Sequence, residues 1–217
     1  GAVSITGTDF GVLNGELRFY PDFTTVEDGL SGQNDYLLCD NPVWSHRAVD
    51  CAIPAGQGSL FRVFLSANGQ MTEITTVSLR YLAPSITRWY LSSPTPNSPL
   101  TQGGEALVLE GTNLGLLPVV TVNDLICDIT DNNQTHVLCL TPYGEGVQNA
   151  VRIEVEDQFD VAATALDFGA PVVTILSPDS GPTSGVVDGA PVIMSIEGVN
   201  FGHDDLAVEF GGFGVAR

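Results

Sequence analysis

Leu109-Glu110-Gly111-Thr112-Asn113-Leu114-Gly115 is the stretch that decides the fold, because it occurs three times in the chain. We call it the glycine motif; the other copies are Ile5-Thr6-Gly7-Thr8-Asp9-Phe10-Gly11 and Ile196-Glu197-Gly198-Val199-Asn200-Phe201-Gly202. Glycine at the third and seventh positions permits a positive φ or the close approach of a neighbouring strand. The Asp or Asn at the fifth position suits a local bond from side chain to backbone, and the following Phe or Leu suits an inward plug.

A second marker repeats with the same period as the glycine motif. Gly111 and Gly198 are 87 positions apart, and Pro84-Ser85-Ile86-Thr87 recurs as Pro171-Val172-Val173-Thr174, also 87 positions later. Two independent markers with one period indicate an internal structural repeat.

The four cysteines follow nearly the same step. Cys39 and Cys51 are 12 positions apart, as are Cys127 and Cys139, and the two pairs are displaced by 88. A proline stands three residues after the second cysteine of each pair, and an aromatic residue, Tyr81 or Phe168, stands three residues before the next repeated proline.

These marks divide the chain into three predicted domains. Residues 1–83 form a first domain without its first strand, residues 84–170 form a complete one, and residues 171–217 form the N-terminal half of a third. The first domain has an insertion at about 22–35, rich in Asp, Gly, Ser and Thr, which predicts a surface loop or an added hairpin.

The apolar residues alternate with polar ones in short runs, which favours strands, and no window has helical periodicity. Predicted strands include Ala106–Glu110, Val119–Val122 and Val151–Glu156, with Leu60–Leu65 in the first domain at the place of the last of these. About seven short strands in fewer than ninety residues are typical of an immunoglobulin-like β-sandwich. The sequence therefore predicts an all-β fold of tandem sandwiches.

The chain resembles the IPT/TIG family of immunoglobulin-like repeats along essentially its whole length. The resemblance is carried by the glycine motif, the leading segment Ser177–Gly185, the Cys-x-x-Pro step and the aromatic residue before the repeated proline. The middle copy departs from the family by having Leu114 where Phe is usual, and by a longer leading segment at Leu91–Gly104. The resemblance implies a module of cell-surface receptors or of other extracellular proteins.

The cysteine spacing predicts two disulfides within domains, Cys39 with Cys51 and Cys127 with Cys139. A loop of that size would stabilise a domain by about 3 kcal/mol in the chain-entropy estimate, and would place the chain in an oxidising compartment. A zinc site is the rival interpretation, although no Cys-x-x-Cys pair exists, and buried free thiols are a third.

The net charge of −19 narrows the range of partners, because all seven basic residues are arginines and lysine is absent. Such a chain repels phosphate backbones, which excludes nucleic acid as an expected partner, and it repels anionic membrane surfaces. No stretch is long and apolar enough for a membrane span. The charge is interpreted as solubility and self-repulsion, with divalent cations as the alternative.

Two further features predict sites on the surface. Asn133-Gln134-Thr135 is a glycosylation sequon in an expected exposed turn between two cysteines. Acidic residues offer oxygen ligands for calcium, although no calcium-binding loop motif is present; the candidates are Asp157, Asp160, Asp204 and Asp205.

Catalysis has no support in the sequence. His46, His136 and His203 lie near no nucleophile motif, and the Gly-x-Gly stretches 56–58 and 144–146 are interpreted as turns. We therefore expect a non-enzymatic structural or adhesive segment of a cell-surface, matrix or filamentous protein, without a cofactor. Its expected partners are neighbouring repeats, copies of itself, or other surface proteins and glycans.

Two alternatives stay open at this stage. One is the ligand-binding stalk of a receptor, which resembles plexin ectodomains. The other is a carbohydrate-binding accessory module, for which exposed aromatic residues would be needed; the candidates are Trp44, Trp89, Tyr90 and Tyr143. The half-domains at the ends predict either a longer array or completion by strands from another chain.

Overall fold

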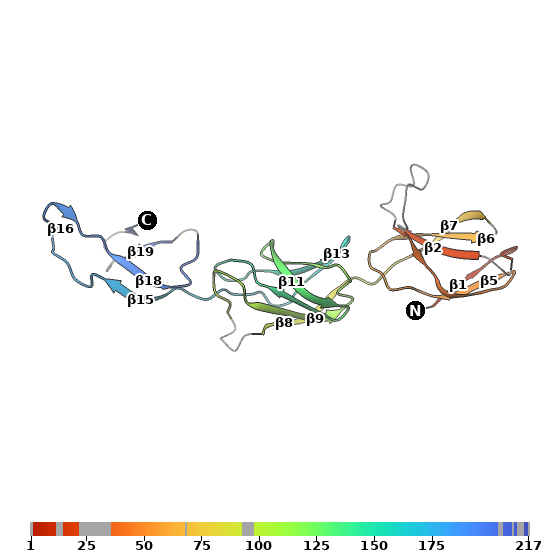
Figure 1. Cartoon of the computed structure of the whole chain (residues 1–217), viewed down its shortest axis with the longest axis horizontal. Helices are drawn as coiled ribbons and strands as arrows, with labels where there is room; N and C mark the ends of the chain where they lie inside the picture. The colour runs from red at the N-terminus through yellow and green to blue at the C-terminus, as the bar shows by residue number, and fades with distance from the viewer. Residues whose placement is uncertain are drawn as a thin grey trace. The chain divides into compact units, whose positions relative to one another are not determined.

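The computed structural model describes residues 2–11, 15–21, 36–67, 69–92, 98–203, 206–209, 211 and 215–216. Every regular element in these residues is a β-strand, and the strands pair antiparallel, which confirms the all-β class (Figure 1). The predicted insertion at 22–35 lies outside the described residues.

The chain divides into two compact units. Unit 1 comprises Gly1–Ser85, Asn113–Pro118 and Glu154–Asp160, and unit 2 comprises Ile86–Thr112, Val119–Ile153 and Val161–Arg217. This division does not follow the period of the sequence, so the three predicted domains stay a prediction.

Unit 1 contains two sheets that share one core. Their orders are β1-β5-β4 and β3-β2-β6-β7, and the strands are β1 (Ala2–Thr6), β2 (Gly15–Pro21), β3 (Leu37–Leu38), β4 (Asp40–Trp44), β5 (Ala48–Ala52), β6 (Phe61–Ala67) and β7 (Gln70–Leu79). Alternate residues of β2 and β6 are buried, as the sequence alternation predicts. Leu17, Phe19 and Val63 from one sheet pack with Val49 from the other, so the two sheets face each other.

Most of a seven-stranded sheet with the order β14-β13-β10-β11-β12-β9-β8 belongs to unit 2, while its residues within Glu154–Asp160 are counted with unit 1. Its strands are β8 (Ser85–Leu91), β9 (Ala106–Thr112), β10 (Val119–Val122), β11 (Leu125–Asn133), β12 (His136–Leu140), β13 (Val151–Val155) and β14 (Gln158–Val161). The first three residues of β11 pair with β10, and its residues from Asp128 onward pair with β12. One strand therefore joins two groups of strands, and the side chains of Leu107, Val120 and Ile153 are fully buried in the core.

The last part of unit 2 contains only strand pairs in its described residues. β15 (Val172–Ser177) pairs with β18 (Ser195–Val199), and two short hairpins follow the same antiparallel pattern; their strands are β16 (Val186–Val187), β17 (Ala190–Pro191), β19 (Val208–Glu209) and β20 (Val215–Ala216). Ile175 and Leu176 of β15 are 50% and 42% exposed, whereas Leu107 and Leu109 of β9 are fully buried.

All three glycine motifs adopt the same backbone. The fifth residue has a positive φ (Asp9, 64°; Asn113, 55°; Asn200, 61°), and so has the seventh (Gly11, 73°; Gly115, 82°; Gly202, 74°). The glycine at the third motif position has no positive φ. It is needed because a neighbour lies close to it: a Cβ on Gly7 would collide with the ring of Phe10, and one on Gly198 with the ring of Phe201. Leu114 is the fully buried plug of the middle motif.

The expected local turn bond of the fifth residue is replaced by a longer connection. Asn113 Nδ2 donates to the carbonyl of Ala83 (3.2 Å), and Asn200 Nδ2 donates to the carbonyl of Ala170 (3.2 Å). The left-handed backbone turns the amide toward the residue that precedes the repeated proline. The fifth residue of the motif therefore binds the segment that lies 30 residues before it in the sequence.

Candidate functional sites

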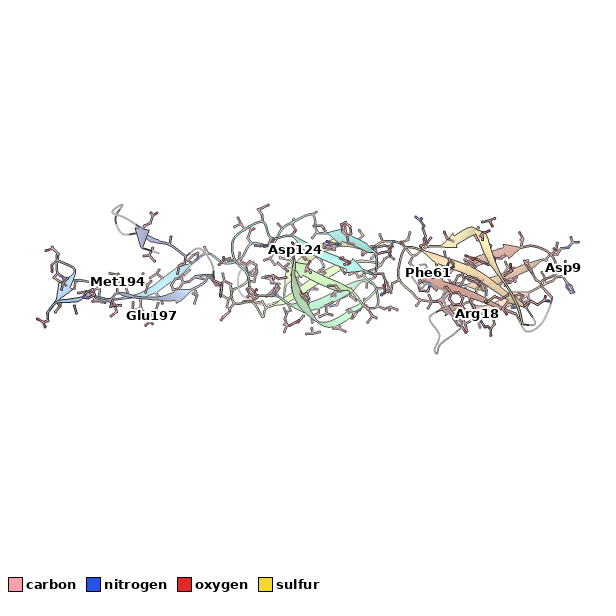
Figure 2. All side chains as sticks on the ribbon, turned by 90° about the horizontal axis from the view of Figure 1, so that it is seen from above. Asp9, Arg18, Phe61, Asp124, Met194 and Glu197 are labelled. Atoms are coloured by element: carbon pink, nitrogen blue, oxygen red, sulfur yellow. A yellow bond between two sulfur atoms is a disulfide. The ribbon has the colours of Figure 1, made fainter. Side chains whose placement is uncertain are left out.

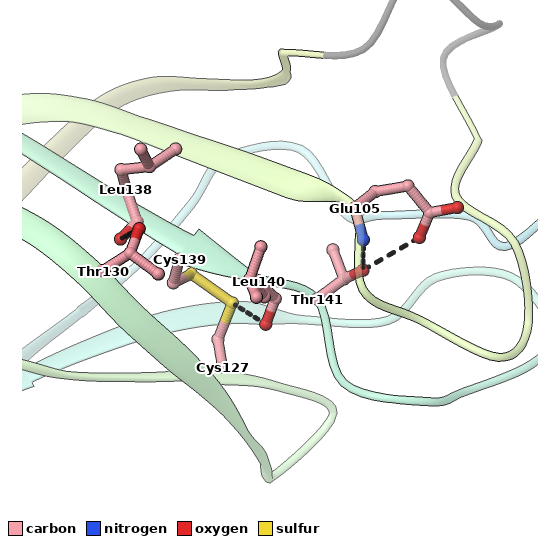
Figure 3. The surroundings of a disulfide bond; sticks show 7 residues. All are labelled: Glu105, Cys127, Thr130, Leu138, Cys139, Leu140 and Thr141. Carbon is pink, nitrogen blue, oxygen red and sulfur yellow. Dashed lines mark hydrogen bonds between the residues drawn. A yellow bond between two sulfur atoms is a disulfide. The ribbon is translucent and has the colours of Figure 1, made fainter.

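The four cysteines form the pairs that the spacing predicts. Cys127 and Cys139 form a disulfide with Cα atoms 5.6 Å apart (Figure 3), and Cys39 and Cys51 form one with Cα atoms 5.8 Å apart. Cys127 is the last residue of β11 that pairs with β10. The disulfide therefore lies where β11 changes its partner strand from β10 to β12.

The first disulfide has the same place in unit 1. β3 pairs with β2 in one sheet, β4 pairs with β5 in the other, and Cys39 is the single residue between β3 and β4. The chain thus passes from one sheet to the other at Cys39, whereas β11 stays within one sheet and changes only its partner strand at Cys127. Both disulfides lie where the chain changes its pairing, and we call them staples.

A Gly-x-Gly turn of unit 1 makes a second kind of connection, which we call the clasp. Gln57 Oε1 accepts hydrogen bonds from the backbone N–H groups of Leu116 (2.8 Å) and Leu117 (3.1 Å), which follow the glycine motif. Gln57 Nε2 donates to Glu156 Oε1 (2.8 Å). One amide side chain thus holds two segments of unit 1 that lie far from it in sequence.

The clasp recurs in unit 2 with the period of the sequence. Glu145, 88 positions after Gln57, accepts a hydrogen bond on Oε2 from the N–H of His203 (2.8 Å), 87 positions after Leu116. A Cβ on Gly115 would lie 3.2 Å from Gln57 Oε1, and one on Gly202 would collide with Glu145 Oε2. Glycine at the seventh motif position therefore gives the clasp room. The sequence showed both turns, but not the bonds of their middle residues.

Two of the calcium candidates belong to unit 1: Asp157 directly precedes β14, and Asp160 lies in it. Asp157 accepts two hydrogen bonds from Ser59, one from its backbone N–H (2.9 Å) and one from its side-chain hydroxyl. These bonds lower the pKa of Asp157 below its ordinary value. Asp204 and Asp205 lie outside the described residues. The described parts of the chain bring no three His, Cys, Asp or Glu side chains together as a metal site.

An aromatic and charged face covers the outer side of β2 and β6. Tyr20 packs against Tyr36 and Phe64, each at 5.1 Å between ring centroids. Arg18 lies over the ring of Tyr36 (4.7 Å), and Arg62 lies over the ring of Phe64 (5.6 Å). Figure 2 labels Arg18 on this sheet. We call these five side chains the arginine–aromatic face.

Each guanidinium of this face has a carboxylate partner. Arg18 Nε donates to Glu16 Oε2 (2.9 Å), a bond that raises the pKa of Arg18, and Arg62 lies 3.9 Å from Glu73. The face is therefore charge-balanced within a chain of net charge −19. The arrangement disfavours a polyanion, which needs uncompensated positive charge. It resembles the mixture of Tyr, Phe and Arg that is enriched in protein interfaces.

A pocket of about 540 Å³ opens beside the clasp of unit 2. Tyr143 and Glu145 come from the turn after β12, Asn123 from the turn between β10 and β11, and Phe168 is the predicted closing aromatic. His203 contributes from beyond the third glycine motif. Its size is in the range of small-ligand sites.

The predicted sequon lies in the hairpin between β11 and β12. Asn133 is exposed, and its Oδ1 accepts bonds from the N–H (2.9 Å) and the hydroxyl (3.0 Å) of Thr135. This exposed turn is the place that the sequence predicts, and attachment of a sugar stays a prediction.

The four aromatic candidates for carbohydrate binding are not gathered into one platform by a described contact. The Tyr90 hydroxyl donates a hydrogen bond to Glu110 Oε1 (3.1 Å), and Trp89 Nε1 donates one to the carbonyl of Thr164 (2.8 Å). Trp44 packs against the core of unit 1. Tyr143 alone of the four lines the pocket.

Comparisons with known proteins give structural similarity only. No protein-family model matches the chain, and the curated proteins contain no significant match. One similar solved structure is the full extracellular region of plexin A4, with 16% identity and a TM-score of 0.40, covering 77% of this chain and 16% of that one. Another is SGBP-B from a xyloglucan utilization locus of Bacteroides uniformis, with 15% identity, a TM-score of 0.35, and coverage of 87% and 55%. The chain spans less than two thirds of the length of either.

A membrane-crossing helix is not found among the residues that the structure describes.

Proposed function

We propose that this chain is a non-catalytic, extracellular structural segment of IPT/TIG type, in which the clasps and the disulfides hold the strand sandwiches under load. The observation that carries this proposal is the recurrence of the clasp. Gln57 in unit 1 and Glu145 in unit 2 accept backbone N–H groups at the same place after a glycine motif.

The recurrence supports a mechanical role because each clasp joins distant parts of the chain, by hydrogen bonds from backbone N–H groups to a side-chain oxygen. Each N–H that the clasp satisfies would otherwise need water, and a net hydrogen bond contributes about 0.5–1.5 kcal/mol. The disulfides add covalent links where β11 changes its partner strand and where the chain passes from β3 in one sheet to β4 in the other. Together these contacts resist separation of the segments in which they lie.

Pulling the chain from both ends in a single-molecule experiment tests this role. We expect Gln57→Ala to lower the force at which unit 1 opens, because the N–H groups of Leu116 and Leu117 lose their acceptor. Gln57→Glu keeps an acceptor oxygen for these N–H groups but replaces the amide that donates to Glu156 by a carboxylate, so it should lower the force by the loss of that bond alone. Gln70→Ala on the exposed end of β7 is the control. Equal opening forces for all four chains would refute the role of the clasp.

The extracellular location is supported by the two disulfides. Expression through a secretory pathway, followed by peptide mapping without reduction, tests it. We expect the pairs Cys39 with Cys51 and Cys127 with Cys139. Free thiols in the secreted protein would contradict the location and the staple role together.

A second candidate function, recognition of a protein partner, is favoured by the arginine–aromatic face. Beads coated with the chain distinguish the two: a purely structural segment leaves cells unbound, whereas a recognition segment binds them. The double variant Tyr20→Ser with Phe64→Ser should then abolish the binding, while Tyr90→Ser should not. Binding that survives the double variant would remove this face as the contact surface.

A further inference from the structure

The pocket of unit 2 has a carboxylate on one wall. Among the described residues that line it, Glu145 is the one carboxylate and none is an arginine. The chain contains no lysine. An anionic ligand would therefore meet a negative wall and a net charge of −19.

The carboxylate of Glu145 is held in place by the clasp. Its Oε2 accepts the N–H of His203 at 2.8 Å, which fixes the carboxylate at the edge of the pocket. A fixed carboxylate loses little conformational entropy when a ligand donates to its other oxygen. The clasp thus prepares an acceptor for a donor group that enters the pocket.

Two aromatic rings complete the lining. Phe168 is only 6% exposed, whereas Tyr143 is 62% exposed. Aromatic rings attract cations to their faces, and a guanidinium stacks on such a ring while donating to a carboxylate. The amide of Asn123 adds a neutral partner for further N–H groups.

We propose that this pocket binds the arginine side chain of a basic partner polypeptide. The guanidinium donates to Glu145 and stacks on Tyr143, and the methylene stem passes between the rings. The net charge of −19 attracts a basic partner from a distance and repels a second copy of this chain. This proposal is independent of the mechanical role, because it concerns Glu145 Oε1 and not the bond of Oε2 to His203.

A pair of peptides that differ only in charge tests the proposal. The probes are acetyl-Gly-Arg-Gly-amide and the same peptide with citrulline, which has the shape of arginine without its charge. Titration of the isotope-labelled 217-residue chain, followed by NMR, should shift the amide signals of Tyr143, Gly144 and Glu145 with the arginine peptide. We expect the citrulline peptide to bind at least about tenfold more weakly, since charge-assisted bonds are the stronger ones.

The clasp of unit 1 indicates which substitution of Glu145 removes its charge without removing its hydrogen bond. Gln57 shows that an amide oxygen accepts the same backbone bonds, so Glu145→Gln should keep the clasp and remove only the charge. We expect this variant to keep the unfolding temperature and to lose the preference for arginine over citrulline. Asp128→Asn, on the exposed face of β11 outside the pocket, is the matched control.

Tyr143→Leu gives an independent readout if the Glu145 variant is destabilised. It should weaken the arginine peptide several-fold, because Tyr143 is exposed and its loss leaves the core intact. Equal shifts with both peptides, unchanged selectivity in Glu145→Gln, or no shifts at the pocket would each overturn the proposal. The last result would leave a pocket that only water occupies.

Discussion

The first and the middle sequence repeat share their strand order, but the corresponding side chains are buried more deeply in the middle repeat. Leu114, the plug of the middle glycine motif, is fully buried, whereas Phe10 in the first is partly exposed. β9 has a neighbour on both edges, β12 and β8, while β1 has only β5 among the described residues.

The closing aromatics show the same difference. Phe168 is 6% exposed, and Tyr81 is half-buried and donates its hydroxyl to the carbonyl of Pro54 (2.9 Å). Burial raises the pKa of Tyr81, with the charge of Asp40 as the smaller cause. The comparison teaches that one sequence pattern can be stabilised by packing in one copy and by a specific hydrogen bond in the other.

The largest expected effect comes from removing the two plugs. Leu114→Ala should lower the free energy of unfolding by about 2–5 kcal/mol, because it leaves a cavity in a closed core. Phe10→Ala should cost less, since Phe10 is only partly buried where it packs against the core of unit 1. Hydrogen exchange of the amides of β9 and β1 measures each separately. Equal losses would break the comparison.

Next in size are the disulfides. Replacing both cysteines of either pair by serine should cost about 3 kcal/mol, since the closed loops have the same length. The middle pair should cost somewhat more, because Cys127 and Cys139 are 1% and 0% exposed against 8% and 5% for Cys39 and Cys51. Urea unfolding of the two double variants measures the difference. A chain that is unaffected by either would remove the staple interpretation.

The positions of several strands were predictable because alternation and the repeated markers are local signals. The predicted Val119–Val122 is β10, and the predicted Val151–Glu156 differs from β13 by one residue. The arginine–aromatic face was not predicted. Alternation places Arg18 and Tyr20 outward, but the register that sets Arg18 opposite Phe64 and Tyr20 opposite Arg62 depends on pairing across the sheet.

The clasp escaped prediction for a related reason. A Gln or Glu between two glycines is a common turn composition, and nothing in the turn names its partner. The glycine at the seventh motif position leaves room for the Gln or Glu side chain, but the sequence does not show that the two come together in space.

Two glycines with one conformation separate backbone strain from crowding by neighbouring side chains. Gly11 and Gly115 have φ values of 73° and 82°, but a Cβ on Gly11 meets open space, whereas one on Gly115 meets Val155 and Gln57. Gly11→Ala should therefore cost about 1–2 kcal/mol for the left-handed backbone alone. Gly115→Ala should cost about 1–3 kcal/mol more, as overpacking does. Chemical denaturation of both variants measures the difference, and equal costs would mean that Val155 and Gln57 both move aside at no cost.

The smallest effect concerns Asp157, which has hydrogen bonds from Ser59 in unit 1 and no counterpart bond described for unit 2. Its pKa is lowered in the folded chain, so its bonds stabilise unit 1 above the unfolded pKa of about 3.9, and this stability is lost as the pH falls below that value. Asp157→Asn should lower the urea midpoint slightly at pH 7 and by less at pH 3, because the stability that the charge contributes is lost as the pH falls from the unfolded pKa through the lower folded pKa. Asp128→Asn is the control for charge alone. Because Asp157 is exposed, solvent screens the bond and the effect stays small. A midpoint that falls equally at both pH values would assign the loss to packing of the side chain and not to its charge.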